Sequence, residues 1–156
     1  AAQLRVGGQT TDEVGFSSFP LFEDPSFEMA GNDNSQSLDG ARSLRLDPAP
    51  GHQHRSFPLY LRHKRRYAIS LAYRRTAGTD GGSFARVHES VHGGNLVPKV
   101  VLRFRKDGDW DRVNGEFATS ADFVAASLFV YNSRSDRTVW VDDVTVKDLG
   151  PAQGTD

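Results

Sequence analysis

The sequence predicts an all-β protein, an antiparallel β-sandwich of the jelly-roll type with about ten short strands. Short runs in which apolar and polar residues alternate recur along the whole chain. Gly, Asn, Asp and Pro separate these runs, and no segment follows the helical period over about twelve residues. Strands that follow one another without intervening helices favour a sandwich over a parallel sheet.

Each strand is predicted from one alternating run and the turn residues that bound it. The predicted strands are 16–22, 26–29, 43–47, 55–61, 67–75, 84–91, 97–105, 115–118, 125–132 and 138–147. We expect residues 1–15 to be a lead-in, residues 16–149 to form the sandwich and residues 150–156 to be an exit linker. A single domain suits a chain of 156 residues.

Composition excludes several classes of protein. The chain has no Cys, which excludes disulfides, thiolate metal sites and a cysteine nucleophile. No apolar run approaches the roughly 18 residues of a membrane-spanning helix. The only Met is Met29, so we expect the chain to derive from a longer precursor.

Period-two parity assigns side chains to the two faces of a strand. In 67–75, Tyr67, Ile69, Leu71 and Tyr73 are expected in the core, and Arg74 points away. In 125–132, Ala126, Leu128 and Val130 are expected in the core, and Phe129 and Tyr131 point away. Two aromatic rings on a non-core face are unusual for a face that only meets water.

Charge is unevenly distributed, although the formal net charge is only −1. Residues 52–106 contain twelve bases and two acids. These bases are either solvated side chains on outward strand faces or a basic surface for an anionic partner.

Five motifs in order resemble carbohydrate-binding modules of the CBM4/CBM9/CBM22-like superfamily. They are residues 25–28 (Pro-Ser-Phe-Glu), 40–46 (Gly-Ala-Arg-Ser-Leu-Arg-Leu), 66–73 (Arg-Tyr-Ala-Ile-Ser-Leu-Ala-Tyr), Trp110 with 117–119 (Phe-Ala-Thr), and 140–144 (Trp-Val-Asp-Asp-Val). The sequence departs from the family at 63–66, where His-Lys-Arg-Arg replaces the usual Pro-Gly. The resemblance implies a sandwich whose concave face holds glycan.

The same resemblance implies a structural calcium ion. Calcium binds hard oxygen ligands from carboxylates and carbonyls, and we expect Glu28 and Asp142 to supply carboxylates, with carbonyls near Gly31 and Ser43. Alternatively, Asp142 and Asp143 only cap a strand end or pair with a base.

A glycan site needs an aromatic platform and fixed polar groups. The non-core faces supply candidates, namely Tyr131, Phe129, Arg74, Arg86 and His88. Because Arg binds carboxylate and sulfate in a bidentate way, a uronate or sulfated glycan is one hypothesis. Trp110 and Trp140 are expected to pack in the core, and a loop covering Phe129 is the alternative to a role in binding.

The run from His88 to His92 matches the H-E-x-x-H signature of zinc proteases. That signature binds zinc only on a helix, and flanking Gly pairs leave about ten residues for one. On a strand, His88, Ser90 and His92 instead share the face of Arg86. Zinc proteolysis is therefore a minor alternative.

We predict a non-catalytic, carbohydrate-binding module that targets a parent secreted glycoside hydrolase or lyase to polysaccharide. Its expected partners are a polysaccharide or oligosaccharide and the parent catalytic domain, without nucleic acid or membrane, and we expect a monomer, secreted or at the cell surface. Two alternatives are a structural spacer without a ligand site and a small jelly-roll glycosidase.

Overall fold

The computed structural model describes residues 42–79 and 81–152, positions 31, 33, 35, 37, 38 and 40, and the backbone of 4–6 and 9–11. All regular structure in this part of the chain is β. The strands are β1 (Leu4–Val6), β2 (Gln9–Thr11), β3 (Leu44–Leu46), β4 (His54–Leu59), β5 (Arg65–Arg75), β6 (Gly82–Val91), β7 (Leu96–Arg103), β8 (Asp111–Ala118), β9 (Phe123–Ser133) and β10 (Val139–Pro151).

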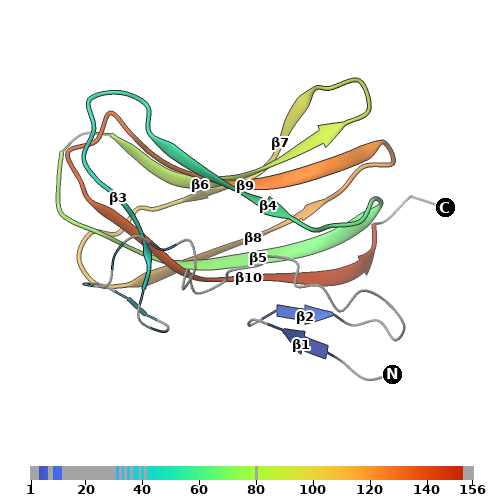
Figure 1. Cartoon of the computed structure of the whole chain (residues 1–156), viewed down its shortest axis with the longest axis horizontal. Helices are drawn as coiled ribbons and strands as arrows, with labels where there is room; N and C mark the ends of the chain where they lie inside the picture. The colour runs from blue at the N-terminus through green and yellow to red at the C-terminus, as the bar shows by residue number, and fades with distance from the viewer. Residues whose placement is uncertain are drawn as a thin grey trace.

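The strands form two sheets that pack face to face, as the two layers in Figure 1 show. One sheet has the order β1-β2-β10-β5-β8, with β3 also paired to β10, and the other has the order β4-β9-β6-β7. Neighbours are antiparallel except where Thr10 of β2 meets Lys147 of β10 in parallel. The predicted all-β sandwich is thus confirmed.

The described residues include no helix that is long and apolar enough to cross a bilayer.

The core lies between the sheets and follows the predicted parity. On β5, Tyr67, Ile69, Leu71 and Tyr73 are at most 1% exposed. On β9, Ala126, Leu128 and Val130 face them from the other sheet, and all are buried. Apolar residues at every second position therefore fix which face of each strand is turned inward.

A bulge in β10 changes this parity once. Val139 and Val141 are buried in the core, and the next core residue is Val144 rather than residue 143. The pairing with β5 shifts between Asp142 and Thr145, and Asp143 has a φ of 50°. Asp142 points away from the core by ordinary alternation after Val141, and the bulge that follows it turns Val144 inward.

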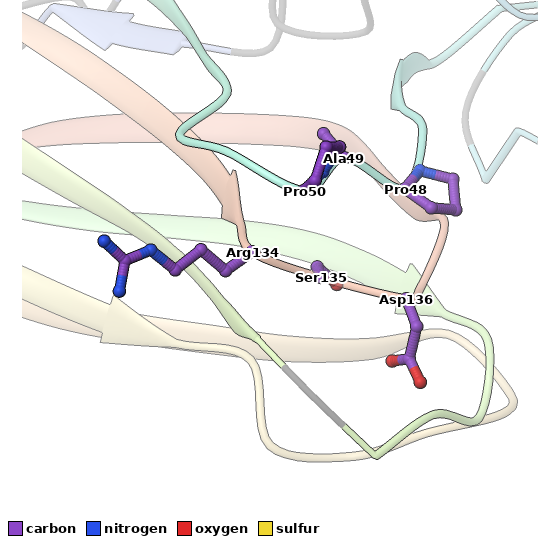
Figure 2. Close-up of a pocket in the computed structure, with 6 residues that line it drawn as sticks. All are labelled: Pro48, Ala49, Pro50, Arg134, Ser135 and Asp136. Atoms are coloured by element: carbon purple, nitrogen blue, oxygen red, sulfur yellow. The ribbon is translucent and has the colours of Figure 1, made fainter.

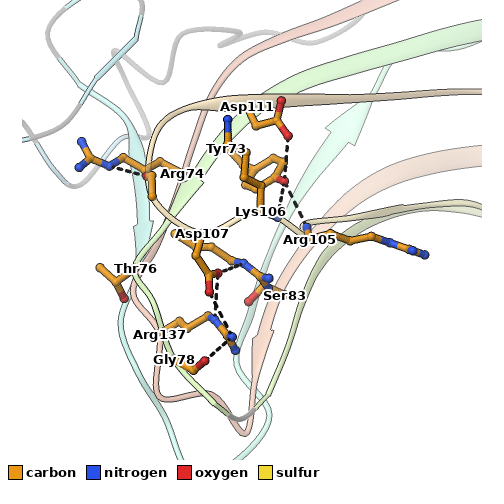
Figure 3. Close-up of polar contacts among 12 residues, drawn as sticks. Tyr73, Arg74, Thr76, Gly78, Ser83, Arg105, Lys106, Asp107, Asp111 and Arg137 are labelled. Carbon is orange, nitrogen blue, oxygen red and sulfur yellow. Dashed lines mark hydrogen bonds and ion pairs between the residues drawn. The ribbon is translucent and has the colours of Figure 1, made fainter.

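At one end of the sandwich, charged side chains tie the connecting loops together (Figure 3). Asp107 forms ion pairs with two arginines. Its Oδ1 lies 2.6 Å from Nε of Arg75 and 3.2 Å from Nε of Arg137. Arg137 also donates to the carbonyl of Gly78 at 2.6 Å. The hydroxyl of Tyr73 accepts hydrogen bonds from the backbone amides of Arg105 and Lys106. These contacts join three connections, β5–β6, β7–β8 and β9–β10.

The ends of the chain differ from the prediction. The expected lead-in contains β1 and β2, and β10 extends through Gly150 to Pro151, inside the expected exit linker. The predicted strands 16–22 and 26–29 lie outside the described residues. At the departure from the family motif, Lys64 has a φ of 57°, the left-handed conformation that a Gly would adopt more easily.

Candidate functional site

One face of the β4-β9-β6-β7 sheet points away from the core, and we call it the outer face. Strand registers align its residues in rows across all four strands, such as His54, Tyr131, Phe84 and Arg103. Its members are His54, Ser56 and Pro58 on β4, Ser127, Phe129 and Tyr131 on β9, Phe84, Arg86, His88 and Ser90 on β6, and Leu96, Pro98, Val101 and Arg103 on β7.

Aromatic rings gather on the outer face. The rings of Phe84 and Tyr131 stack with centroids 4.6 Å apart, and Phe129 lies 6.0 Å from Tyr131. The imidazole of His88 lies 4.7 Å from Phe129, and that of His54 lies 5.7 Å from the same ring. The rings are partly exposed, so they can offer apolar surface to the C–H faces of a sugar.

Arg86 lies above this cluster. Its guanidinium carbon is 5.2 Å from the ring centre of Tyr131 and 5.7 Å from that of Phe84. Nη2 of Arg86 donates to the hydroxyl of Tyr131 at 3.3 Å. Two rings and a hydroxyl therefore hold a planar donor group in place on the outer face.

Three nitrogen atoms beside this cluster have no hydrogen-bond partner. They are Nε of Arg86 and both ring nitrogens of His88, and neighbouring side chains cover all three. Burial lowers the pKa of His88 below its ordinary value of 6.5, and the charge of Arg86 lowers it further. Buried polar atoms without a hydrogen-bond partner are uncommon in folded proteins.

The outer face has no acidic side chain among its described members, although it has Arg86, Arg103 and two histidines. On the opposite sheet, by contrast, two outward arginines have acidic partners. Arg66 binds Glu116 at 2.7 Å, and Arg112 binds Asp143. Among the described residues, the outer face thus carries positive charge with no acid on the same face, which favours negatively charged ligands.

The structure brings four of the five predicted glycan-binding residues together. Tyr131, Phe129, Arg86 and His88 share the outer face. Arg74 does not, because it lies on β5 in the other sheet. Its Nε donates to the carbonyl of Gly108 at 3.0 Å, and its guanidinium lies over Trp140. The prediction that Arg74 joins the other four was wrong.

The two tryptophans were expected in the core, and neither belongs to the hydrophobic cluster between the two sheets. Trp110 is partly exposed in the β7–β8 connection. Trp140 is buried on the face of β10 that points away from the core, where Nε1 donates to Asp33 at 2.6 Å. Burial raises the pKa of Asp33, but hydrogen bonds from Ser35 and Trp140 and the charge of Arg45 outweigh it and lower the value to about 2.

The predicted calcium ligand Asp142 is fully buried on this same face of β10. Its Oδ2 accepts the backbone amide of Leu38 and its Oδ1 that of Asp143, each at 2.8 Å. A buried carboxylate beside the backbone of another segment suits a hard cation that also takes carbonyl ligands. Glu28 lies outside the described residues, and those described contain no group of three His, Asp or Glu that could hold a metal.

The H-E-x-x-H run does not form a zinc site. His88 lies on the outer face of strand β6, whereas Glu89 lies on the core side and is 1% exposed. Glu89 accepts the amide and hydroxyl of Ser120 at 2.7 and 2.8 Å, with Lys99 at 3.7 Å. His92 follows the end of the strand. A zinc site of this type needs all three side chains close together, as on one side of a helix. Because the run is a β-strand, His88 and Glu89 point to opposite faces, and the protease alternative is wrong.

A second candidate is a pocket of about 490 Å³ at one end of the sandwich. Two prolines, Pro48 and Pro50, line it together with Arg134 and Asp136. In Figure 2 the Arg134 and Asp136 side chains extend in different directions. The carboxylate of Asp136 also accepts hydrogen bonds from the backbone amide and the hydroxyl of Thr79. Its polar groups do not converge as those of a ligand site do, so the outer face is the stronger candidate.

No protein-family model matches the chain, and no curated protein matches it. Its fold is similar to that of a family 16 carbohydrate-binding module, with a TM-score of 0.67 and 16% identity over 81% of this chain and 98% of that one. It is also similar to the CBM22-1 xylan-binding domain of Paenibacillus barcinonensis Xyn10C, with a TM-score of 0.61 and 14% identity over 77% and 80%.

A third similar structure contains the CBM22-1 and GH10 modules of the Clostridium thermocellum xylanase Xyn10B, complexed with xylohexaose. Its TM-score is 0.60 and its identity 14%, over 75% of this chain and 24% of that one. At such identities the likeness is one of fold. The resemblance to the CBM4/CBM22-like jelly rolls is therefore confirmed at the level of fold.

Sequence analysis missed three aromatic or basic members of the outer face, namely Phe84, His54 and Arg103. Phe84 could have been found, because it precedes Arg86 by two positions on the same predicted strand. His54 and Arg103 could not, since they join the site through the pairing of β4 with β9 and of β7 with β6. The register between strands is not contained in the parity of any one strand.

Proposed function

We propose that this chain is a non-catalytic, carbohydrate-binding module that binds an anionic polysaccharide, with uronate or sulfate groups, on the outer face. The observation that carries the proposal is the Phe84–Phe129–Tyr131 cluster with Arg86 held over it. The rings offer apolar surface to a sugar, and Arg86 offers donors to its charged group.

The module would serve a secreted or cell-surface enzyme that degrades polysaccharide. The fold it shares with modules of xylanases supports this role. Attachment to such an enzyme would raise the local concentration of the catalytic domain at its substrate. We expect the module to act as a monomer, and neither nucleic acid nor membrane to be a partner.

A structural calcium ion is part of the proposal. Asp142 would be one ligand, Glu28 a second, and backbone carbonyls near Gly31 and Ser43 would complete the set. The ion would supply a tie between β10 and the segment that precedes β3, on the sheet opposite the outer face. In this arrangement calcium stabilises the fold and does not contact glycan.

Affinity electrophoresis tests the binding site. Wild type should be retarded in gels that contain a polyuronate or a sulfated galactan, and less so in gels that contain neutral xylan. Tyr131→Ala should weaken retardation at least about tenfold, because the loss of a central aromatic anchor costs more than about 1.4 kcal/mol. Tyr131→Phe keeps the ring and should retain most of the affinity.

Arg86→Gln tests the charge. It should weaken binding to the anionic polymers and leave binding to xylan unchanged, whereas Arg66→Gln on the opposite sheet is the matched control and should bind as wild type does. Retardation of Tyr131→Ala equal to that of wild type in every gel would contradict the outer-face site. A wild type that no polysaccharide retards would favour the spacer function.

A further inference from the structure

We propose that His88 couples glycan binding to the uptake of one proton, so that the outer face holds anionic glycan more tightly in mildly acidic solution. This inference rests on the function proposed above and adds a regulation of the same site. Its basis is the position of His88, on the same face as Arg86 and against the ring of Phe129.

His88 has an environment that disfavours its charged form in the free protein. Neither of its ring nitrogens has a hydrogen-bond partner, and both are covered. A neutral imidazole has one N–H donor, whereas the protonated ring has two, which would both lack acceptors here. Burial and the charge of Arg86 accordingly lower the pKa of His88, so the ring is neutral at pH 7.

In the part of the chain that the structure describes, no neighbouring carboxylate counters this effect. Across the sheet, His88 faces Ser127 of β9 and Pro98 of β7, which carry no charge. The charged or titratable groups on the described outer face are Arg86 on its own strand, Arg103 on β7, Tyr131 on β9 and His54 on β4. The nearest acid in sequence, Glu89, points to the other side of the sheet, where Lys99 and Ser120 bind it.

An anionic group bound at Arg86 reverses the balance. Its negative charge offsets that of Arg86, which lowers the pKa of His88 in the free protein, and so favours the protonated imidazole. The pKa of His88 therefore rises when ligand binds. By linkage, the anionic ligand then binds more tightly to the protonated protein, so affinity rises as the pH falls through the range between the free and bound values.

The experiment measures affinity for a sulfated galactan by isothermal titration calorimetry between pH 5 and pH 8. Sulfate esters stay ionised over this range, so only the protein titrates. We expect wild type to bind about fivefold or more tightly at pH 5 than at pH 8, the lower end of ordinary binding linkage. His88→Gln should lose this dependence, whereas His92→Gln, a histidine beyond the strand end, should keep it.

Nuclear magnetic resonance of the His88 ring in wild type gives a second readout that needs no variant. Its titration midpoint should move to higher pH when the galactan is bound. An unchanged midpoint, or an undiminished pH dependence in folded His88→Gln, would overturn the inference while leaving glycan binding intact. Absence of galactan binding at every pH would instead contradict the proposed function, and with it this inference.

Discussion

Asn132 is a buried polar side chain that connects four parts of the fold. It is 0% exposed and lies on β9, on the core side. Its Nδ2 contacts the carbonyls of Leu46, Asp47 and Arg137 at 2.8–3.3 Å, and its Oδ1 accepts the hydroxyl of Ser83 at 3.1 Å. Both of its polar atoms are therefore satisfied, as a buried amide requires.

Asn132→Ala should lower the free energy of unfolding by about 2–4 kcal/mol, because it leaves buried carbonyls and a hydroxyl without their partner. Urea unfolding followed by fluorescence measures the change. Asn114→Ala, at an exposed position of β8, is the matched control and should change stability by less than about 0.5 kcal/mol. Equal midpoints for the two variants would show that the Asn132 hydrogen bonds do not stabilise the fold.

Single residues also explain where sequence reasoning succeeded and failed for the site. Parity correctly turned Phe129 and Tyr131 away from the core, because one strand carries that information. Parity also turned Arg74 outward, and it is outward. A sandwich has two outward faces, however, and only the pairing of β5 with β10 reveals that Arg74 is on the other one. The same ambiguity explains Trp140, which is buried outside the core.

At the scale of elements, the strands with the clearest alternation were predicted best. The predicted 67–75 and 125–132 lie within β5 and β9, which extend only two residues or fewer beyond them. The predicted 115–118 is the second half of β8, which begins at Asp111. The first half carries Asp111, Arg112 and Asn114 at its exposed positions, a composition that gives little strand signal. Backbone pairing with β5 extends this strand nevertheless.

Strand β8 lies close to β7 of the opposite sheet at Gly115. A Cβ atom built on Gly115 would lie 2.8 Å from Cγ2 of Val100 and 3.1 Å from Cδ2 of Leu102. Both neighbours are on β7, in the other layer. The sequence needs Gly here because no side chain fits between the two strands.

Gly115→Ala should therefore lower the free energy of unfolding by about 1–3 kcal/mol, the usual cost of overpacking. Val100→Ala removes the methyl group that clashes, so the double variant should be more stable than the sum of the two single changes predicts. Thermal or urea unfolding of all four proteins measures this coupling. If the changes in the free energy of unfolding were additive, β7 and β8 would move apart freely at this contact.

At the scale of the molecule, the outward faces of the two sheets carry different kinds of side chain. Within the described residues, the four-stranded sheet carries the aromatic cluster with Arg86, whereas the six-stranded sheet carries the Arg66–Glu116 and Arg112–Asp143 ion pairs and Asp142. The proposed glycan site and the proposed calcium site are thus on opposite sides of one core. A substitution on the six-stranded sheet can then alter the stability of the fold without changing a side chain of the outer face.

Removal of calcium tests whether the proposed metal site stabilises the fold. A ligand that binds only the folded state stabilises it by RT ln(1 + [L]/Kd), about 2.7 kcal/mol at a hundredfold excess over Kd. For a chain of this size that corresponds to a loss of roughly 5–10 °C in Tm when EDTA removes the ion. Calorimetry with EDTA and with added CaCl₂ measures the difference.

Asp142→Asn should abolish this response to EDTA, because the amide lacks the charge that a calcium ligand supplies. Asp122→Asn, at an exposed position, is the control and should respond as wild type does. At a temperature where both forms are folded, EDTA should leave affinity for the anionic glycan unchanged, since Asp142 and the outer face lie on different sheets. A wild-type Tm that is the same in EDTA and in calcium would contradict the metal site and would leave Asp142 with its two backbone amides as its structural role.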